Sequence, residues 1–213
     1  MRVTAHGARA AGAGAPWDRY LLYLLALGIA LFAVLPPSRA AIDSTPPTGS
    51  VYALLLVNLA FLMWTASDLV TPSSARKLVE TAAHAVVGLG LGVPLMLVTR
   101  ATQPVPVLTL LAAYAWLLVL FVLATALAFL ASRLPHASHR WVVFAGILVT
   151  MALLARVDAL HPWMSPLEVL GDILQGRLRG LAAWVGAAYL GTAVALMAGV
   201  LRVEERGQAS GKP

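Results

Sequence analysis

Six long runs of apolar residues, separated by short segments that carry most of the charges, form the main pattern along this chain. The runs cover residues 20–36, 51–70, 81–99, 106–132, 141–155 and 181–201. A helix needs roughly 20 apolar residues to cross a bilayer core, and barrel strands would instead alternate apolar and polar residues. The pattern therefore predicts six transmembrane helices, of which the fifth, over residues 141–155, is the shortest.

The segment between the last two runs, HPWMSPLEVLGDILQGRLRG (residues 161–180), follows a different pattern. Ser165 and Glu168 enclose a proline at the first helical position, which is the capping box that begins a helix, and a glycine at 176 ends it. Within this segment one helical face is apolar and the other polar: Leu167, Leu170, Ile173 and Leu174 against Glu168, Asp172 and Gln175. We predict a short amphipathic helix over residues 165–176, outside the membrane or packed on the spans.

Composition supports a membrane class and orients the chain. The residues are 60% hydrophobic and 11% charged, against roughly 25% charged in soluble domains. If the six runs cross a membrane, ten of the 15 basic residues lie on the side of the two termini and five on the other, so the positive-inside rule predicts cytoplasmic termini. The prediction is an all-α integral membrane protein: a flexible tail over residues 1–16, a single six-helix domain over 17–206 and a flexible tail over 207–213. Residues 1–40 also resemble a secretory signal, but the first apolar run is longer than a signal core, so we expect a retained first span.

Candidate chemistry is sparse. Of the acidic, basic and histidine residues, only Asp68 and His84 fall within an apolar run, and both lie near its end, where a side chain reaches the interface. The chain has no cysteine, no recognised catalytic motif and no histidine pair within the spans. We therefore expect no catalytic residue, no cofactor, no metal site and no nucleic-acid partner. Glycines 88, 90 and 92 predict a close helix-packing face rather than a nucleotide loop.

Two segments carry a resemblance to a known family. They are TPSSARKLVE (residues 71–80), in which Thr71 before a proline predicts a helix start, and SPLEVLGDILQG (residues 165–176), followed by the last span and a charged tail, RVEER. Over about residues 50–206 the chain resembles the membrane subunit of type-2 ABC exporters, including the small haem-exporter-like permeases. The resemblance implies two partners besides the lipid bilayer, a cytoplasmic ATPase subunit and a second permease subunit, and a bacterial inner membrane.

The same resemblance implies roles for eight residues. Coupling to the ATPase would fall to Ser73, Ser74, Arg76 and Lys77, and an outer gate helix would contain Ser165, Glu168, Leu170 and Asp172. The function it implies is a permease that moves an amphipathic or lipid-like cargo, because the spans lack the buried charges that small ions need. The alternative is a non-catalytic subunit that anchors a larger membrane complex, which accounts equally well for the apolar spans.

Overall fold

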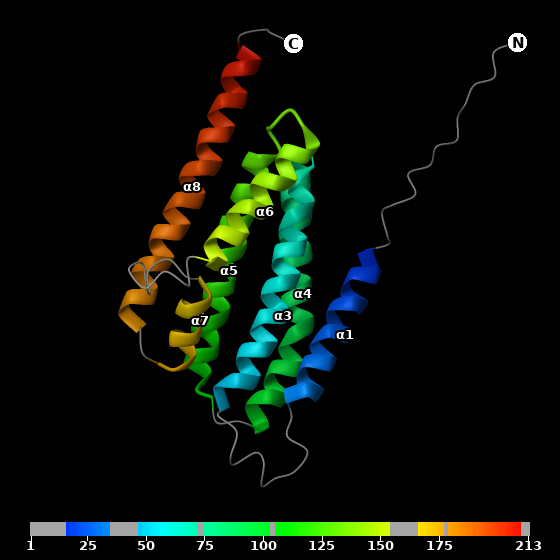
Figure 1. Cartoon of the computed structure of the whole chain (residues 1–213), viewed down its shortest axis with the longest axis vertical. Coiled ribbons are helices and arrows are strands. Elements are labelled where there is room, and N and C mark those ends of the chain that lie inside the picture. The colour runs from blue at the N-terminus through cyan, green and yellow to red at the C-terminus, as the bar shows by residue number, and fades with distance from the viewer. Residues whose placement is uncertain are drawn as a thin grey trace, which may run out of the picture.

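The computed structural model describes residues 16–34, 47–71, 75–102, 105–153, 166–176 and 179–209, and every regular element in these ranges is helical. The long helices are α1 (Pro16–Val34), α3 (Pro47–Ser67), α4 (Ala75–Thr102), α5 (Val107–Ala131), α6 (Ala137–Leu153) and α8 (Arg179–Ala209). A 3-10 helix, η1 (Asp68–Val70), follows α3, and a short helix, α7 (Pro166–Leu174), lies between α6 and α8. Consecutive long helices run in opposite directions, so the start of α1 and the end of α8 point toward one end of the bundle (Figure 1). We call this the terminal end and the opposite one the far end.

The prediction of an all-helical membrane protein is confirmed for the residues that the structure describes. Among the described residues, three helical stretches are long and apolar enough to cross a membrane: Val51–Val70, Arg76–Val98 and Val107–Ala131. Shorter apolar stretches, Ala137–Thr150 and Trp184–Gly199, lie in α6 and α8. These helices indicate a membrane protein, whereas crossing by all six long helices stays a prediction.

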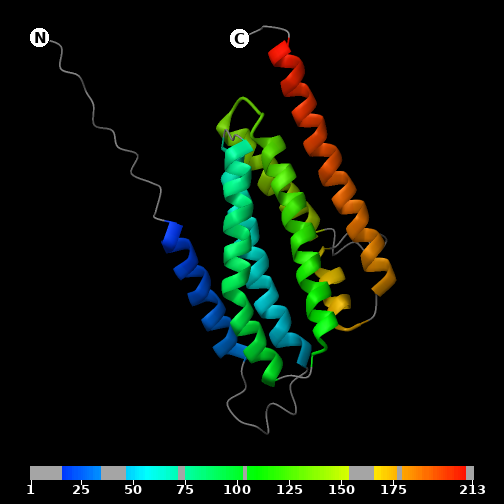
Figure 2. The same cartoon turned by 180° about the vertical axis from the view of Figure 1, so that it is seen from behind.

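Helix α5 forms the centre of the bundle and packs against α3, α6, α7 and α8. Its 25 residues include no charged side chain, so burial on several sides costs little desolvation. Leu117 of α5 and Leu54, Leu55 and Leu62 of α3 are completely buried and make up much of the main core. Figure 2 shows α1 and α8 on opposite sides of the bundle, with α4 and α5 between them.

Helix α4 approaches α1 and α3 closely through two of its glycines. At Gly88 a Cβ atom would overlap the ring of Phe61, and at Gly92 it would lie 2.5 Å from the hydroxyl oxygen of Tyr23 and 3.1 Å from Oδ1 of Asn58. Gly90 has no neighbouring atom within 4 Å. The predicted close packing is therefore confirmed for two of the three glycines, one helical turn apart, while the third faces away.

Candidate functional site

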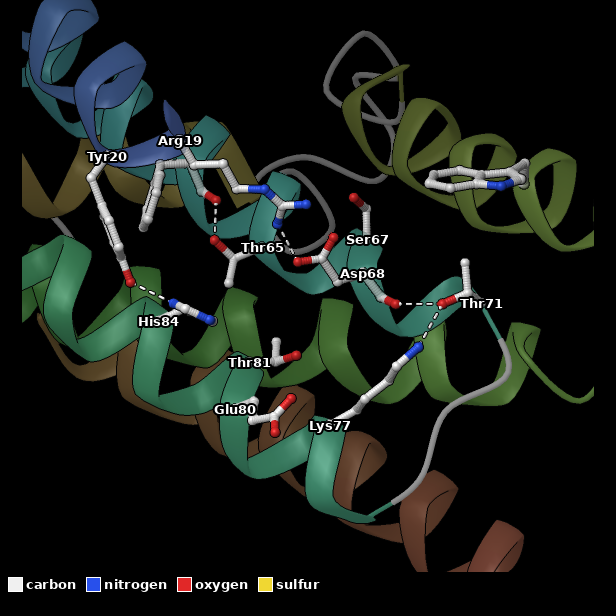
Figure 3. A pocket seen from close by; sticks show the side chains of 12 residues that line it. Arg19, Tyr20, Thr65, Ser67, Asp68, Thr71, Lys77, Glu80, Thr81 and His84 are labelled. Atoms are coloured by element: carbon white, nitrogen blue, oxygen red, sulfur yellow. Dashed lines mark hydrogen bonds and ion pairs between the residues drawn. The ribbon is translucent and has the colours of Figure 1, made fainter. Parts of the chain in front are cut away.

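A pocket of about 420 Å³ opens near the terminal end, where α1, η1, α4 and α6 meet (Figure 3). Its ionisable groups come from three elements: Arg19 of α1, Asp68 of η1, and Lys77, Glu80 and His84 of α4. The remaining wall consists of hydroxyl groups and aromatic rings, including Thr65, Ser67, Tyr20 and Trp141. The pocket thus joins both signs of charge to apolar surface.

The turn at the end of α3 places Asp68 in the wall of this pocket. The hydroxyl of Ser67 donates to the carbonyl of Trp64 (2.6 Å), and the hydroxyl of Thr71 donates to the carbonyl of Asp68 (2.9 Å). These bonds satisfy carbonyls that a helix end leaves without partners, and they tighten the last turn into η1. Thr71 itself is extended, with ψ 156°, and α4 begins at Ala75. The predicted helix start at Thr71 stays a prediction, because residues 72–74 lie outside the described residues and an extended backbone is also typical of the residue that caps a helix.

An ion pair joins α1 to this turn. Nη1 of Arg19 donates to Oδ2 of Asp68, and the guanidinium carbon also lies 5.5 Å from the ring centroid of Trp64. Hydrogen bonding to Asp68 raises the pKa of Arg19, so the guanidinium stays protonated at every physiological pH. Both side chains of the pair remain more than a third exposed, so water and ligands can still reach their charges.

A second polar contact joins α1 to α4. The hydroxyl of Tyr20 shares a hydrogen bond with Nδ1 of His84, and the two rings lie 5.9 Å apart. Tyr20 also meets the exposed ring of Trp17 edge to face, with centroids 6.2 Å apart. Together with the ion pair, this contact attaches the first turns of α1 to the pocket wall.

The predicted coupling residues divide into two groups. Ser73 and Ser74 lie outside the described residues. Arg76 points outward with its side chain 88% exposed, and its Nε donates to Oε1 of Glu80 at 2.9 Å. Lys77, in contrast, lines the pocket, and its Nζ donates to the hydroxyl of Thr71 at 3.2 Å. Of the two described residues, Arg76 is exposed on the surface outside the pocket, while Lys77 lines the pocket.

The predicted amphipathic helix is present as α7, beginning at Pro166 and followed by Gly176 with φ +70°. Positive φ at the residue after a helix favours glycine, as the sequence predicts. Leu170 is completely buried, whereas Glu168 and Asp172 are partly exposed, so the apolar face packs inward. Ser165, the predicted cap, lies outside the described residues.

Two long-range hydrogen bonds hold α7 against the bundle rather than on its surface. The indole N–H of Trp116 in α5 donates to the carbonyl of Pro166 at 2.9 Å, and the hydroxyl of Tyr52 in α3 donates to the carbonyl of Leu167 at 3.3 Å. Carbonyls in the first turn of a helix already have partners within the helix, but each oxygen can accept a second bond. The side chains of α3 and α5 thereby fix the start of α7 in the half of the bundle near the far end.

The sequence did not predict the pocket, because its contacts join residues far apart along the chain. Arg19 and Asp68 are 49 positions apart, and Tyr20 and His84 are 64 apart. A usable signal was present, since Asp68 and His84 both stand at an end of an apolar run, where a polar partner is expected. Within the described ranges, no group of three or more histidine or acidic side chains could hold a metal ion.

Comparison of the chain with known protein families, with curated proteins and with solved structures found no match.

Proposed function

We propose that the chain is the membrane-spanning permease subunit of an ATP-driven exporter in the inner membrane, working with a separate cytoplasmic ATPase. In this proposal all six long helices cross the bilayer and the terminal end faces the cytoplasm. The alternating directions of the helices support it, because they bring the start of α1 and the end of α8 toward the same end (Figure 1). The excess of basic residues on that side supports the orientation.

The observation that carries the proposal is the position of α7. This helix follows α6, packs against α5 and α3, and precedes α8, in the half of the bundle away from the short α3–α4 turn. A permease needs a movable element at the outer mouth and a contact for its energy source at the inner one. Here α7 would serve as the outer gate, with Leu170 on its packed face, and Arg76 at the start of α4 would contact the ATPase.

The mechanism follows from this separation. ATP binding would close two ATPase subunits and push on the first turn of α4 in each of two permease subunits, which would then rock relative to each other. The cargo that we expect is amphipathic or lipid-like. Among the described residues, the buried side chains are apolar or polar without charge, so none of them would balance the charge of a small ion.

Copurification tests the proposal. The tagged chain, extracted in mild detergent, should bring down a nucleotide-binding ATPase in stoichiometric amount, identified by mass spectrometry and by vanadate-sensitive ATP hydrolysis. Arg76→Glu should reduce the amount of ATPase recovered, because a charge at the rim of an interface mainly changes the rate of association. The matched control is Arg202→Glu, an exposed arginine of α8 toward the same end. A wild-type preparation without an ATPase, or equal losses in both variants, contradicts the exporter assignment.

A second candidate, a structural subunit of a larger membrane complex, is favoured by a different observation. The buried polar side chains of the described core include Asn58, Thr65 and Thr125, and no polar path through the bundle is evident from them. Many of the exposed side chains on the helices are large and apolar, including Val86 and Leu97 of α4 and Leu108 of α5. Such a subunit would copurify with other membrane proteins and with no ATPase.

A further inference from the structure

The pocket at the terminal end has a composition that neither an ATPase contact nor a cargo gate requires. From its position and its polar groups we propose that it binds the phosphoethanolamine headgroup of a membrane phospholipid. The inference does not depend on the exporter assignment, because a structural subunit could hold the same lipid.

Tryptophans place the pocket at the depth of lipid headgroups. Trp141 of α6 (47% exposed) lines the pocket, while Trp17 of α1 (72%) and Trp64 of α3 (41%) contact its lining residues Tyr20 and Arg19. Exposed indole rings of membrane proteins concentrate where hydrocarbon meets headgroups. Below this level α1 exposes only apolar side chains such as Leu25 and Ile29, which match acyl chains.

The cationic groups provide a place for a phosphate. Arg19 and Lys77 reach the pocket from different helices, α1 and α4, and both carry several N–H donors. The bond from Arg19 to Asp68 uses one of five guanidinium hydrogens, and the exposed Lys77 donates to Thr71 at the pocket wall, so a ligand in the pocket can reach both charged groups. A phosphodiester carries one negative charge and accepts several hydrogen bonds, so it can lie between the two side chains.

The acceptor groups provide a place for a primary ammonium. Asp68 and Glu80 contribute carboxylates to the wall. The hydroxyls of Thr65 and Ser67 donate to the carbonyls of their own helix, at 2.8 Å and 2.6 Å, and each hydroxyl oxygen can still accept a hydrogen bond. Asp68 already accepts from Arg19 and Glu80 from Arg76, but a carboxylate has about four acceptor positions, so each can also accept from an ammonium. Because the wall carries both signs of charge, it suits a ligand that does the same. An ethanolamine ammonium has three N–H donors, whereas a choline ammonium has none, so the pocket should select the former.

Native mass spectrometry of the purified full chain tests this with four probes. Phosphatidylethanolamine, phosphatidylcholine, phosphatidylglycerol and soluble phosphoethanolamine are titrated separately, with the lipids matched in acyl chains. We expect phosphatidylethanolamine to bind at least about tenfold more tightly than the other three, since a hydrogen bond to a charged group contributes about that factor. Equal binding of phosphatidylcholine, or tighter binding of phosphatidylglycerol, overturns the ammonium assignment. Equal binding of soluble phosphoethanolamine overturns the assignment of the bound headgroup to a membrane lipid.

Two exposed residues separate the phosphate contact from the ammonium contact. Lys77→Gln should weaken the binding of both zwitterionic lipids by about tenfold, while Glu80→Gln should remove the preference for the ethanolamine lipid over the choline lipid. Both side chains lie at the surface, so the fold should persist, which size-exclusion chromatography and helical circular dichroism would check. Arg133→Gln is the matched control, because it removes a cation toward the same end but outside the pocket. Unchanged lipid binding in Lys77→Gln, or an equal loss in the control, overturns the site.

Discussion

Substitution of Gly92 by alanine should loosen the attachment of α4 to α1 and α3. The new methyl group would lie 2.5 Å from the hydroxyl oxygen of Tyr23, which donates to Oδ1 of Asn58 at 2.7 Å. Either the helices separate or this hydroxyl leaves its partner. Overpacking typically costs about 1–3 kcal/mol, and a lost buried hydrogen bond about 1 kcal/mol. We therefore expect Gly92→Ala to lower the free energy of unfolding by about 2–3 kcal/mol.

A double-mutant cycle with Tyr23→Phe tests the cause of this loss. Tyr23→Phe alone should cost about 1 kcal/mol, and it removes the atom that the methyl group would meet. Gly92→Ala should then cost less in the Tyr23→Phe background than in the wild type, with a coupling free energy of about 1–2 kcal/mol. Reversible unfolding in mixed micelles, followed by tryptophan fluorescence, measures all four proteins.

Gly90→Ala is the control, because no atom of a neighbouring helix lies within 4 Å of the position that its new methyl group would take. A helical glycine gains stability on substitution by alanine, so this variant should be neutral or stabilised by up to about 1 kcal/mol. Equal stabilities of the alanine variants at positions 90 and 92, or additive effects in the cycle, would refute the reasoning.

Three further predictions concern α7 and the orientation of the bundle. Trp116→Phe removes the indole donor to Pro166, and it should increase amide hydrogen exchange of α7 by roughly fivefold, in keeping with about 1 kcal/mol for one hydrogen bond; unchanged exchange would contradict a role for this bond. Leu170→Asp places a carboxylate at a completely buried position; it should reduce transport far more than the amount of folded protein if α7 is a gate, and a transport loss that only follows protein level contradicts the gate. Cysteines introduced at Gln175, directly after α7, and at Ser138, in the first turn of α6, are both exposed and should differ in labelling by an impermeant maleimide in intact cells. We expect Gln175→Cys to be labelled and Ser138→Cys to be protected, and the opposite result would reverse the proposed orientation.

Local signals account for the parts of the structure that the sequence predicted. The apolar runs, the proline at 166 and the glycine at 176 each act within a few residues, so they indicate where helices lie and where α7 begins and ends. The close packing predicted for glycines 88, 90 and 92 is present at Gly88 and Gly92, which are one helical turn apart, whereas Gly90 faces away from them. The polar pocket was not predictable in this way. The pairing of Arg19 with Asp68 depends on how α1 docks beside α3, and no pattern within a few residues of either position indicates that docking.

The continuity of α4 has a mechanical consequence. The helix runs without a break through 28 residues, a length of about 42 Å, which exceeds the roughly 30 Å hydrocarbon core of a bilayer. It therefore forms a stiff rod with one weak point, because Pro94 lacks the amide hydrogen that would bond to the carbonyl of Gly90. A displacement applied at Arg76 would travel unreduced along the rod for about four turns. It would then reach the turn in which Pro94 cannot bond to Gly90, and there Tyr23 and Asn58 pack against Gly92.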